Sequence, residues 1–491
     1  MNDTDAPQNP SDSGSPRRER RAARSRRKKA GAITAGAIVL ALGAYAAVDA
    51  YDLVPGLPGV LTTEPQVEVQ TVPTPQARAQ QVPAPASAVG DSAPVPTQIP
   101  KEIDAVLKES KVKGFGLEVR DGLSDDVLYA KNETKPRTPA SVTKVLTAAA
   151  SLSAIGGETR LETTTDFDAD TNTLTLTGGG DVLLSAGVSD PGSVNGHGGL
   201  RTLAEDTAAA LKDENITEVA LNLDTSRYVG EDFDSGWERV DIAKGVITPI
   251  QPIMVDTAYI GSKQAEWRGR SEHPAEDAFT IFERELKKTG ITVTEAAAES
   301  ESEDSKELAR VESATISEIV EYALVHSDNV VAEMLGNEVA IAQGKEGSLD
   351  NGPDAVLEAL GESVDLGRTH LVDTSGLSYD NRIAPHDLTT VLQASVVADD
   401  SLAGLISYFP VGGLTGTLHD RFGDEENASG VVHAKTGTLS TVTSLAGGVL
   451  DAEGRYLVFS IQIDDVDKDK ILEARKTVDD IVTALANCGC R

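Results

Sequence analysis

Apolar and polar residues follow regular spacings from about residue 98 onward, and these spacings predict the first elements of a globular domain. A helix and two strands are expected at residues 103–111, 114–121 and 127–132. The next stretch, residues 138–157, is almost entirely small and apolar, with Pro139 near its start and Gly156-Gly157 at its end. These are start and stop signals for a helix of about four turns. The pattern therefore predicts a strand–strand–helix unit that follows the first helix.

The middle of the chain has a different character. Short strand patterns at residues 173–184 and 216–226 lie among many glycines, and we expect one amphipathic helix, at residues 275–290. An acidic, serine-rich run at residues 295–307 indicates a solvated boundary loop. The sequence thus predicts an inserted β-rich domain over residues 161–304.

The last part of the chain returns to helical spacing and then to alternating strands. Helices are expected at residues 313–340, with a break in the middle, and at 354–362, 385–398 and 471–487; strands are expected at 431–437, 443–451 and 455–464. Antiparallel strands followed by a helix suggest that the end of the chain packs beside its beginning. The expected fold class is α/β, of the α+β kind, in which an antiparallel sheet is flanked by helices and a β-rich domain is inserted.

The residues before position 98 lack this periodicity. A basic tail, residues 1–29, carries nine Lys/Arg against four Asp/Glu, and residues 30–48 follow without a charge. That length crosses the hydrocarbon core of a bilayer, so we expect a transmembrane signal-anchor helix at residues 30–50. The positive charges place the tail in the cytoplasm and the body outside. Residues 51–97, rich in Pro, Gln, Val and Ala, predict an extended linker.

A cleavable signal peptide is the alternative interpretation of this segment, because Ala44-Tyr45-Ala46 resembles a cleavage site. Both interpretations export the body, either held at a bacterial cell membrane by one helix or secreted. The two cysteines, Cys488 and Cys490, would then lie where disulfides persist. A structural clip, an intermolecular link and free thiols all remain open for them.

The charge balance narrows the choice of partners. The 491-residue chain has a net charge of −34, of which the tail contributes +5, so the remainder carries about −39. Such an acidic body repels the phosphates of nucleic acids. We therefore expect no nucleic-acid partner.

A Ser-x-x-Lys motif on the apolar helix is the first candidate for chemistry. The motif occurs three times, at Ser25–Lys28, Ser110–Lys113 and Ser141–Lys144. Only the third lies on an apolar helix, where positions i and i+3 share a face. Burial disfavours a charged ammonium, so Lys144 could take the proton of the Ser141 hydroxyl and make it a nucleophile. Taken alone, the motif also fits a lysine that extends from a core helix to water.

Two further motifs accompany it. Ser327-Asp328-Asn329 marks the break between two helical segments, and Lys435-Thr436-Gly437 lies on a predicted strand. A second Lys-Thr-Gly, at residues 288–290, ends the amphipathic helix, where glycine is an ordinary terminator. The strand copy is the candidate, because a strand beside the serine can hold a substrate backbone and offer an amide to an oxyanion.

In this order, the three motifs are those of class A beta-lactamases and penicillin-binding proteins. Ser141 and Ser327 are 186 positions apart, much farther than in a class A beta-lactamase. The chain instead resembles the D-alanyl-D-alanine carboxypeptidase/endopeptidase family, the class C low-molecular-mass penicillin-binding proteins. The resemblance covers roughly residues 100–485 and extends to four longer stretches: Gly178–Asp181, residues 328–335, residues 373–388 and residues 410–418. The inserted domain is shorter than in the larger members of that family.

The resemblance implies the penicillin-binding, serine beta-lactamase-like transpeptidase fold, with the catalytic domain formed by residues 98–160 and 305–491. It also implies that Ser141 is acylated by the penultimate D-alanine carbonyl of a peptidoglycan stem peptide, with Lys144 as base. Ser327 would pass the proton to the leaving group, and Lys435 would supply positive potential near that serine. Carboxypeptidase and endopeptidase activity both fit this chemistry, and beta-lactams should acylate the same serine.

The same resemblance assigns the substrate-binding residues. Asn329 would bond a substrate amide, and Thr436 and Thr438, on either side of Gly437, would hold the terminal carboxylate or the flanking backbone. The backbone amides of Ser141 and Thr438 would form the oxyanion hole. Two alternatives stay open: a beta-lactamase or esterase that uses the same Ser–Lys site, and a non-catalytic scaffold that binds the cell wall.

Other chemical signals are weak. Residues 166–172 and 465–469 resemble the start of a calcium loop, but the first lacks the glycine at position six and the acid at position twelve, and the second fails in the same way. The seven histidines show no paired ligand spacing, and the three glycines at 178–180 lack the Lys-Ser/Thr of a phosphate loop. We therefore predict no metal site and no cofactor.

Overall fold

The computed structural model of the protein describes most of the chain after residue 97: residues 98–110, 112–261, 268–295, 305–361, 364–398, 401–423 and 427–488. These residues belong to one compact unit. The predicted tail, membrane-spanning helix and linker lie outside the described residues, as does Cys490. In the part that is described, no helix combines the length and the apolar character needed to cross a membrane.

The main domain contains a five-stranded antiparallel sheet in the order β10-β11-β12-β1-β2. The strands are β1 (Phe115–Asp121), β2 (Val127–Lys131), β10 (Val432–Leu439), β11 (Val442–Leu450) and β12 (Tyr456–Ile463). β12 pairs with β1 along its length, so the last strand of the chain lies beside the first. The predicted packing of the chain's end against its beginning is confirmed.

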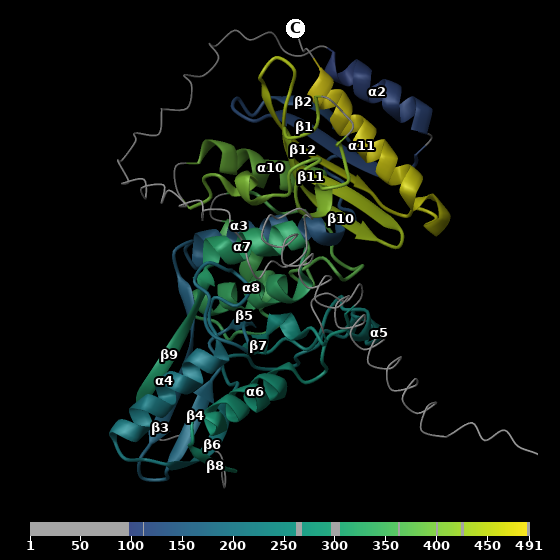
Figure 1. Cartoon of the computed structure of the whole chain (residues 1–491). Helices are drawn as coiled ribbons and strands as arrows, with labels where there is room; N and C mark the ends of the chain where they lie inside the picture. The colour runs from purple at the N-terminus through teal and green to yellow at the C-terminus, as the bar shows by residue number, and fades with distance from the viewer. Residues whose placement is uncertain are drawn as a thin grey trace, which may run out of the picture. The chain divides into compact units, whose positions relative to one another are not determined.

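Helices cover both faces of this sheet (Figure 1). They are α2 (Ile99–Ser110), α10 (Pro385–Val397) and α11 (Ile471–Asn487). α2 and α11 pack on one face, where Leu457, Phe459 and Ile461 of β12 join their core, whereas Val458 joins the core on the side of α10. This alternation follows from the two-residue period of a strand buried on both faces.

A helical region packs beside the sheet and carries the Ser-x-x-Lys and Ser-Asp-Asn motifs. Its helices are α3 (Lys144–Ala154), α7 (Ile316–His326), α8 (Asn329–Ala342) and α9 (Gly352–Gly361). α3 contacts the other three and is buried along most of its length, which explains its almost wholly apolar sequence. α7 starts with a capping box, in which the Thr315 hydroxyl accepts from the Glu318 amide and the Glu318 carboxylate accepts from the Thr315 amide.

The inserted domain contains a second five-stranded sheet in the order β8-β6-β4-β3-β9. Its strands are β3 (Arg160–Asp168), β4 (Thr173–Thr177), β6 (Glu218–Asp224), β8 (Thr292–Glu295) and β9 (Lys306–Thr315), and its long helices are α4 (Leu200–Asp213) and α6 (Pro274–Lys288). The two helices contact each other and share one core with the sheet. β4 pairs in parallel with β6, and β6 with β8, so this sheet is mixed.

Two expectations for the insert need correction. The sequence predicted one amphipathic helix, yet α4 is a second one, which buries Leu200, Leu203 and Leu211 against the sheet. The boundary was expected after residue 304, but β9 pairs with β3, so the insert's sheet continues to Thr315. The sequence pattern assigned residues 308–312 to no element and placed the start of the next helix at residue 313, so only the pairing with β3 assigns this strand to the insert.

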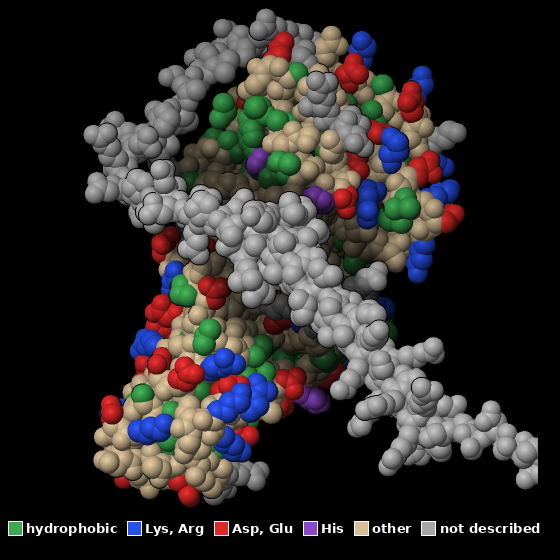
Figure 2. Space-filling model, in the orientation of Figure 1, with side chains coloured by type: hydrophobic (Ala, Val, Ile, Leu, Met, Phe, Trp, Pro, Cys, Tyr) green, Lys and Arg blue, Asp and Glu red, His purple; other side chains and the backbone are tan. Residues whose placement is uncertain are grey.

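Shorter elements connect these parts: α5 (Val240–Ala243), β5 (Asp181–Leu184), β7 (Ile253–Val255), η1 (Ala140–Thr143), η2 (Asp256–Ala258), η3 (Leu405–Tyr408), η4 (Gly416–Leu418) and η5 (Lys468–Lys470), where η denotes a 3₁₀ turn. Acidic and basic side chains are interspersed on the visible face of the insert, over α4 and α6 (Figure 2). Cys488, directly after α11, is buried and disulfide-bonded, so it is not a free thiol.

Candidate active site

Ser141 and Lys144 lie at the junction of η1 and α3. η1 begins at Ala140, whose φ of 51° is unusual for a residue with a side chain. The turn then leads into α3, which starts at Lys144. The Lys144 ammonium nitrogen lies 3.2 Å from the Ser141 hydroxyl, so the predicted sharing of one helical face is confirmed.

Lys144 is enclosed by protein, with 1% of its surface exposed. Its Nζ also lies 2.6 Å from Asn329 Oδ1 and 2.7 Å from the Ser375 carbonyl oxygen. Burial lowers the pKa of Lys144 from 10.5 to about 8, although the carboxylates of Asp373, Glu333 and Asp328 oppose the shift. The side chain is therefore neutral in a much larger fraction of molecules than an exposed lysine at the same pH.

The Ser375 carbonyl is held in place by a buried carboxylate from α8. Glu333 accepts hydrogen bonds from the Ser375 amide at 2.8 Å and from the Thr374 hydroxyl at 2.8 Å. Next in the chain, Gly376 has a φ of +80°, and a Cβ there would lie 2.0 Å from the Ala140 carbonyl oxygen. Only glycine fits this close approach, which brings the Ser375 segment against the turn that carries Ser141.

The Ser-Asp-Asn motif forms the junction between α7 and α8. Ser327 has a left-handed conformation (φ 54°, ψ 36°) that ends α7, and the Asp328 carboxylate caps α8 by accepting from the Val330 and Val331 amides. This turn directs the Ser327 hydroxyl toward Lys435, whose Nζ lies 2.8 Å away. Burial, together with the neighbouring Lys144 charge, lowers the pKa of Lys435 well below its ordinary value.

The insert holds the Ser-Asp-Asn turn from the other side. Arg270 donates to Oδ2 of Asp328 at 3.0 Å, and both side chains are almost completely buried. Trp237, also from the insert, donates to Asp373 at 3.1 Å, and Asp373 in turn accepts from the Gly376 amide. The inserted domain is thus bonded directly to both segments that surround Lys144.

We expect replacement of Arg270 by glutamine to lower the free energy of unfolding by on the order of 3 kcal/mol, because it leaves the Asp328 carboxylate buried with its charge uncompensated. Urea denaturation would measure the change. The control is Arg310→Gln, which removes ion pairs to Glu162 and Glu307 whose side chains are all more than a third exposed. That change should cost much less, because water and salt screen ion pairs between exposed side chains. Equal losses in the two variants would contradict a special role for Arg270.

Strand β10 brings the Lys-Thr-Gly motif against the serine turn. A Cβ on Gly437 would lie 2.7 Å from the Pro139 carbonyl oxygen and 2.1 Å from the Ser444 hydroxyl, which itself donates to that carbonyl. Gly437 therefore lets the strand approach η1 to within direct contact. On either side of it, Thr436 and Thr438 face a cavity of about 250 Å³.

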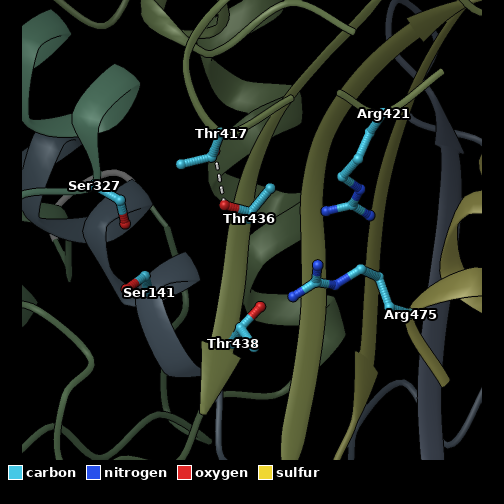
Figure 3. Close-up of a pocket in the computed structure, with 7 residues that line it drawn as sticks. All are labelled: Ser141, Ser327, Thr417, Arg421, Thr436, Thr438 and Arg475. Atoms are coloured by element: carbon cyan, nitrogen blue, oxygen red, sulfur yellow. Dashed lines mark hydrogen bonds between the residues drawn. The ribbon is translucent and has the colours of Figure 1, made fainter. Parts of the chain in front are cut away.

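This cavity joins the three motifs (Figure 3). It is lined by Ser141, Ser327, Thr417, Arg421, Thr436, Thr438 and Arg475. The structure therefore brings the three predicted segments together around one space. Asn329 lies beside this space and contacts the base: its Oδ1 accepts from Lys144, and its Nδ2 donates to the Val246 carbonyl at 3.0 Å. The other described copies of the motifs lie elsewhere, at the end of α2 and at the end of α6.

Residues 99–266 and 260–485 match the D-Ala-D-Ala carboxypeptidase 3 (S13) family. The chain belongs to this family. A carboxypeptidase of Mycobacterium tuberculosis is 31% identical over 427 residues, which cover 85% of this chain and 90% of the relative. Carboxypeptidase DacB of Mycolicibacterium smegmatis is 32% identical over 424 residues, which cover 83% of this chain and 90% of the relative.

A solved structure supports the fold assignment of this S13 protein. Penicillin binding protein 4 from Haemophilus influenzae superimposes with a TM-score of 0.64 at 21% identity, covering 78% of this chain and 98% of that chain. The matching family model and the two carboxypeptidase relatives confirm the predicted family. Membership of the S13 family and the two carboxypeptidase relatives also support the predicted serine-type D-Ala-D-Ala carboxypeptidase activity.

Several residues of this S13 site were missed by sequence reasoning. Thr417 lies in the stretch 410–418, which the resemblance had included without assigning a role, and its hydroxyl accepts from Thr436 at 2.8 Å. Arg421 and Arg475 have no local pattern that marks them, because one follows η4 and the other is a polar position of an amphipathic helix. Arg270 was missed for the same reason, because nothing in the sequence around it indicates its ion pair with Asp328.

Proposed function

We propose that this protein trims peptidoglycan stem peptides by acylating Ser141 with the penultimate D-alanine and releasing the terminal one. The observation that carries the proposal is the set of contacts around Lys144 Nζ. The Asn329 side-chain oxygen and the Ser375 carbonyl can only accept hydrogen bonds, whereas the Ser141 hydroxyl can also donate. A neutral amine that donates to the first two presents its lone pair to Ser141, the geometry of a general base.

In the proposed reaction, the peptide C–N bond is replaced by an ester bond between the carbonyl carbon and Ser141 Oγ. Ser141 Oγ bonds to the carbonyl carbon, its proton passes to Lys144, and the backbone amides of Ser141 and Thr438 stabilise the oxyanion. The C–N bond breaks as Ser327, hydrogen-bonded to Lys435, delivers a proton to the departing amine, and the proton that Lys144 took from Ser141 replaces the one that Ser327 gives up. Water hydrolyses the ester and regenerates the hydroxyl.

The cavity supplies groups for the substrate. Thr436 and Thr438 line it beside the two serines, where they would bond the terminal carboxylate or the flanking backbone. Asn329 keeps a second Nδ2 hydrogen and a second Oδ1 lone pair beyond its contacts with Val246 and Lys144, and these would bond a substrate amide. Its firm contact with Lys144 gives it a second task, that of orienting the base.

Release of D-alanine from a synthetic stem pentapeptide tests the proposal, combined with mass mapping of a penicillin adduct. We expect one D-alanine per peptide and an adduct on the tryptic peptide that contains Ser141. A solved structure of the Haemophilus influenzae protein holds a beta-lactam, which supports the same chemistry here. The lifetime of the adduct separates the two enzyme classes: slow release fits a peptidase, and rapid turnover would indicate a beta-lactamase instead.

We also propose that residues 30–50 anchor the body outside a bacterial cell membrane, with residues 51–97 as the linker to the wall. The uncharged run after a basic tail supports this placement. Membrane fractionation and the N-terminal mass of the mature protein would test it. A mature chain that starts after Ala46 would instead show a cleaved signal peptide.

A further inference from the structure

The cavity wall beyond the threonines carries two arginines that the proposed reaction does not use. Arg421 follows η4, and Arg475 lies near the start of α11, so two segments distant in sequence bring them together. Figure 3 shows their guanidinium groups next to each other. In the same view, Thr436 and Thr438 lie between these groups and the two serines.

The arginine pair is not neutralised by protein. Arg421 forms an ion pair with Asp479, in which Nε lies 3.0 Å from Oδ1. Arg475 forms no hydrogen bond or ion pair with the described residues, and its Nε is buried without a partner. Two guanidinium groups and one carboxylate leave a net positive charge at the cavity wall. A buried donor without an acceptor is costly, and an anionic ligand would relieve that cost.

The position of the pair separates it from the terminal carboxylate of the substrate. That carboxylate is attached to the carbon next to the scissile nitrogen, so it lies close to Ser141 and within the reach of Thr436 and Thr438. The arginines lie on the far side of these threonines. The arginines therefore face the side chain of the leaving residue. This side chain differs between substrates, whereas the terminal carboxylate is common to all of them.

We infer that Arg421 and Arg475 form an anion subsite for a second carboxylate, carried on the side chain of the leaving residue. The inference rests on the proposed function, because it takes Ser141 as the point of cleavage. Guanidinium groups suit this task, since their fixed fork of donors matches a carboxylate in two parallel bonds. A leaving D-alanine has only a methyl group at this place, whereas a longer acidic residue fills the subsite.

Matched peptides test the inference in the full-length protein. They end in D-Ala-D-Ala, D-Ala-D-Glu, D-Ala-D-Gln or D-Ala-D-2-aminoadipate, and kcat/KM is measured from release of the last residue. D-Glu and D-Gln differ only in charge, and aminoadipate extends the reach by one methylene. We expect the wild type to prefer the better of the two acidic residues over D-Gln by about tenfold, and Arg475→Gln to reduce that preference to about twofold or less.

Two further variants control for structural effects. Arg475→Lys keeps the charge but not the fork and should retain part of the preference. Arg284→Gln removes an exposed arginine of the insert, far from the cavity lining, and should retain all of it. The preference is the ratio of two kcat/KM values measured on one enzyme sample. Partial unfolding of a variant lowers both values by the same factor, so the ratio does not change.

Two outcomes would overturn the inference. In the first, the wild type cleaves both acidic peptides no faster than the D-Gln peptide. In the second, Arg475→Gln lowers kcat/KM for D-Ala-D-Ala as much as for the acidic peptides, which would assign the arginines to the shared terminal carboxylate. Failure of the proposed function gives a different result, in which no peptide is cleaved and penicillin does not label Ser141.

Discussion

Replacement of Ser141 by alanine should abolish acylation by penicillin and release of D-alanine, with a loss of at least about 10⁴-fold in both rates. Among the described residues, the Ser141 hydroxyl combines two features expected of a nucleophile: it lies 3.2 Å from the Lys144 amine, and it lines the cavity. Ser327 cannot replace it, because its own contact is with Lys435. Gel fluorescence with a labelled penicillin and chromatography of released D-alanine would measure the two rates.

The chain offers a matched control in its other described Ser-x-x-Lys motif. Ser110 donates to the Leu107 carbonyl at the end of α2, and Lys113 is exposed. Ser110→Ala should label with penicillin as fast as the wild type. Persistent labelling of Ser141→Ala, mapped to another residue, would show that the nucleophile has been assigned wrongly.

Replacement of Lys144 by methionine should lower the acylation rate by about 10²- to 10⁴-fold, the usual contribution of a general base. Methionine keeps the length and apolar character of the side chain but has no lone pair to accept the Ser141 proton. Stopped-flow measurement of acylation by a chromogenic beta-lactam would give the rate. Lys113→Met is the control, and its rate should match that of the wild type.

The same lysine sets the pH dependence of acylation. Since burial lowers the pKa of Lys144 to about 8, the neutral fraction falls as pH decreases below that value. We expect the wild-type rate to rise by about tenfold per pH unit below pH 8 and to level off above it. The residual acylation rate of the Lys144→Met variant should not show this rise with pH. A flat wild-type profile between about pH 6 and 9 would contradict Lys144 as the base.

The lowered pKa of Lys144 also makes the free energy of unfolding depend on pH. Unfolded Lys144 holds its proton up to about pH 10.5, whereas the folded form releases it near 8. The unfolded state therefore binds more protons between these values, and the free energy of unfolding contributed by this group rises with pH across the window, by about 3 kcal/mol in total. Below pH 8 the penalty for burying the charge is fully present, and the methionine variant lacks this contribution.

Much of the fold was predictable because its information is local. The strands and helices of the main domain follow the period of their apolar residues, and the pairing of β12 with β1 follows from antiparallel strands at both ends of the chain. Helix α4 could have been found in the same way, since Leu200, Leu203 and Leu211 have helical spacing. Strand β9 was not predicted, because only its pairing with β3 shows that it belongs to the sheet of the insert.

The sequence by itself determined the family and the candidate nucleophile, because three short motifs in a fixed order are enough to identify the chemistry. Only the tertiary structure decided how the base is oriented and what surrounds the substrate. The Ser375 carbonyl that holds Lys144, the Arg270 guanidinium on Asp328 and the arginines at the cavity wall come from distant segments. Every residue has the same backbone carbonyl, and a single arginine forms no repeating pattern, so the sequence does not mark either group. Their roles depend on which groups the fold places next to them.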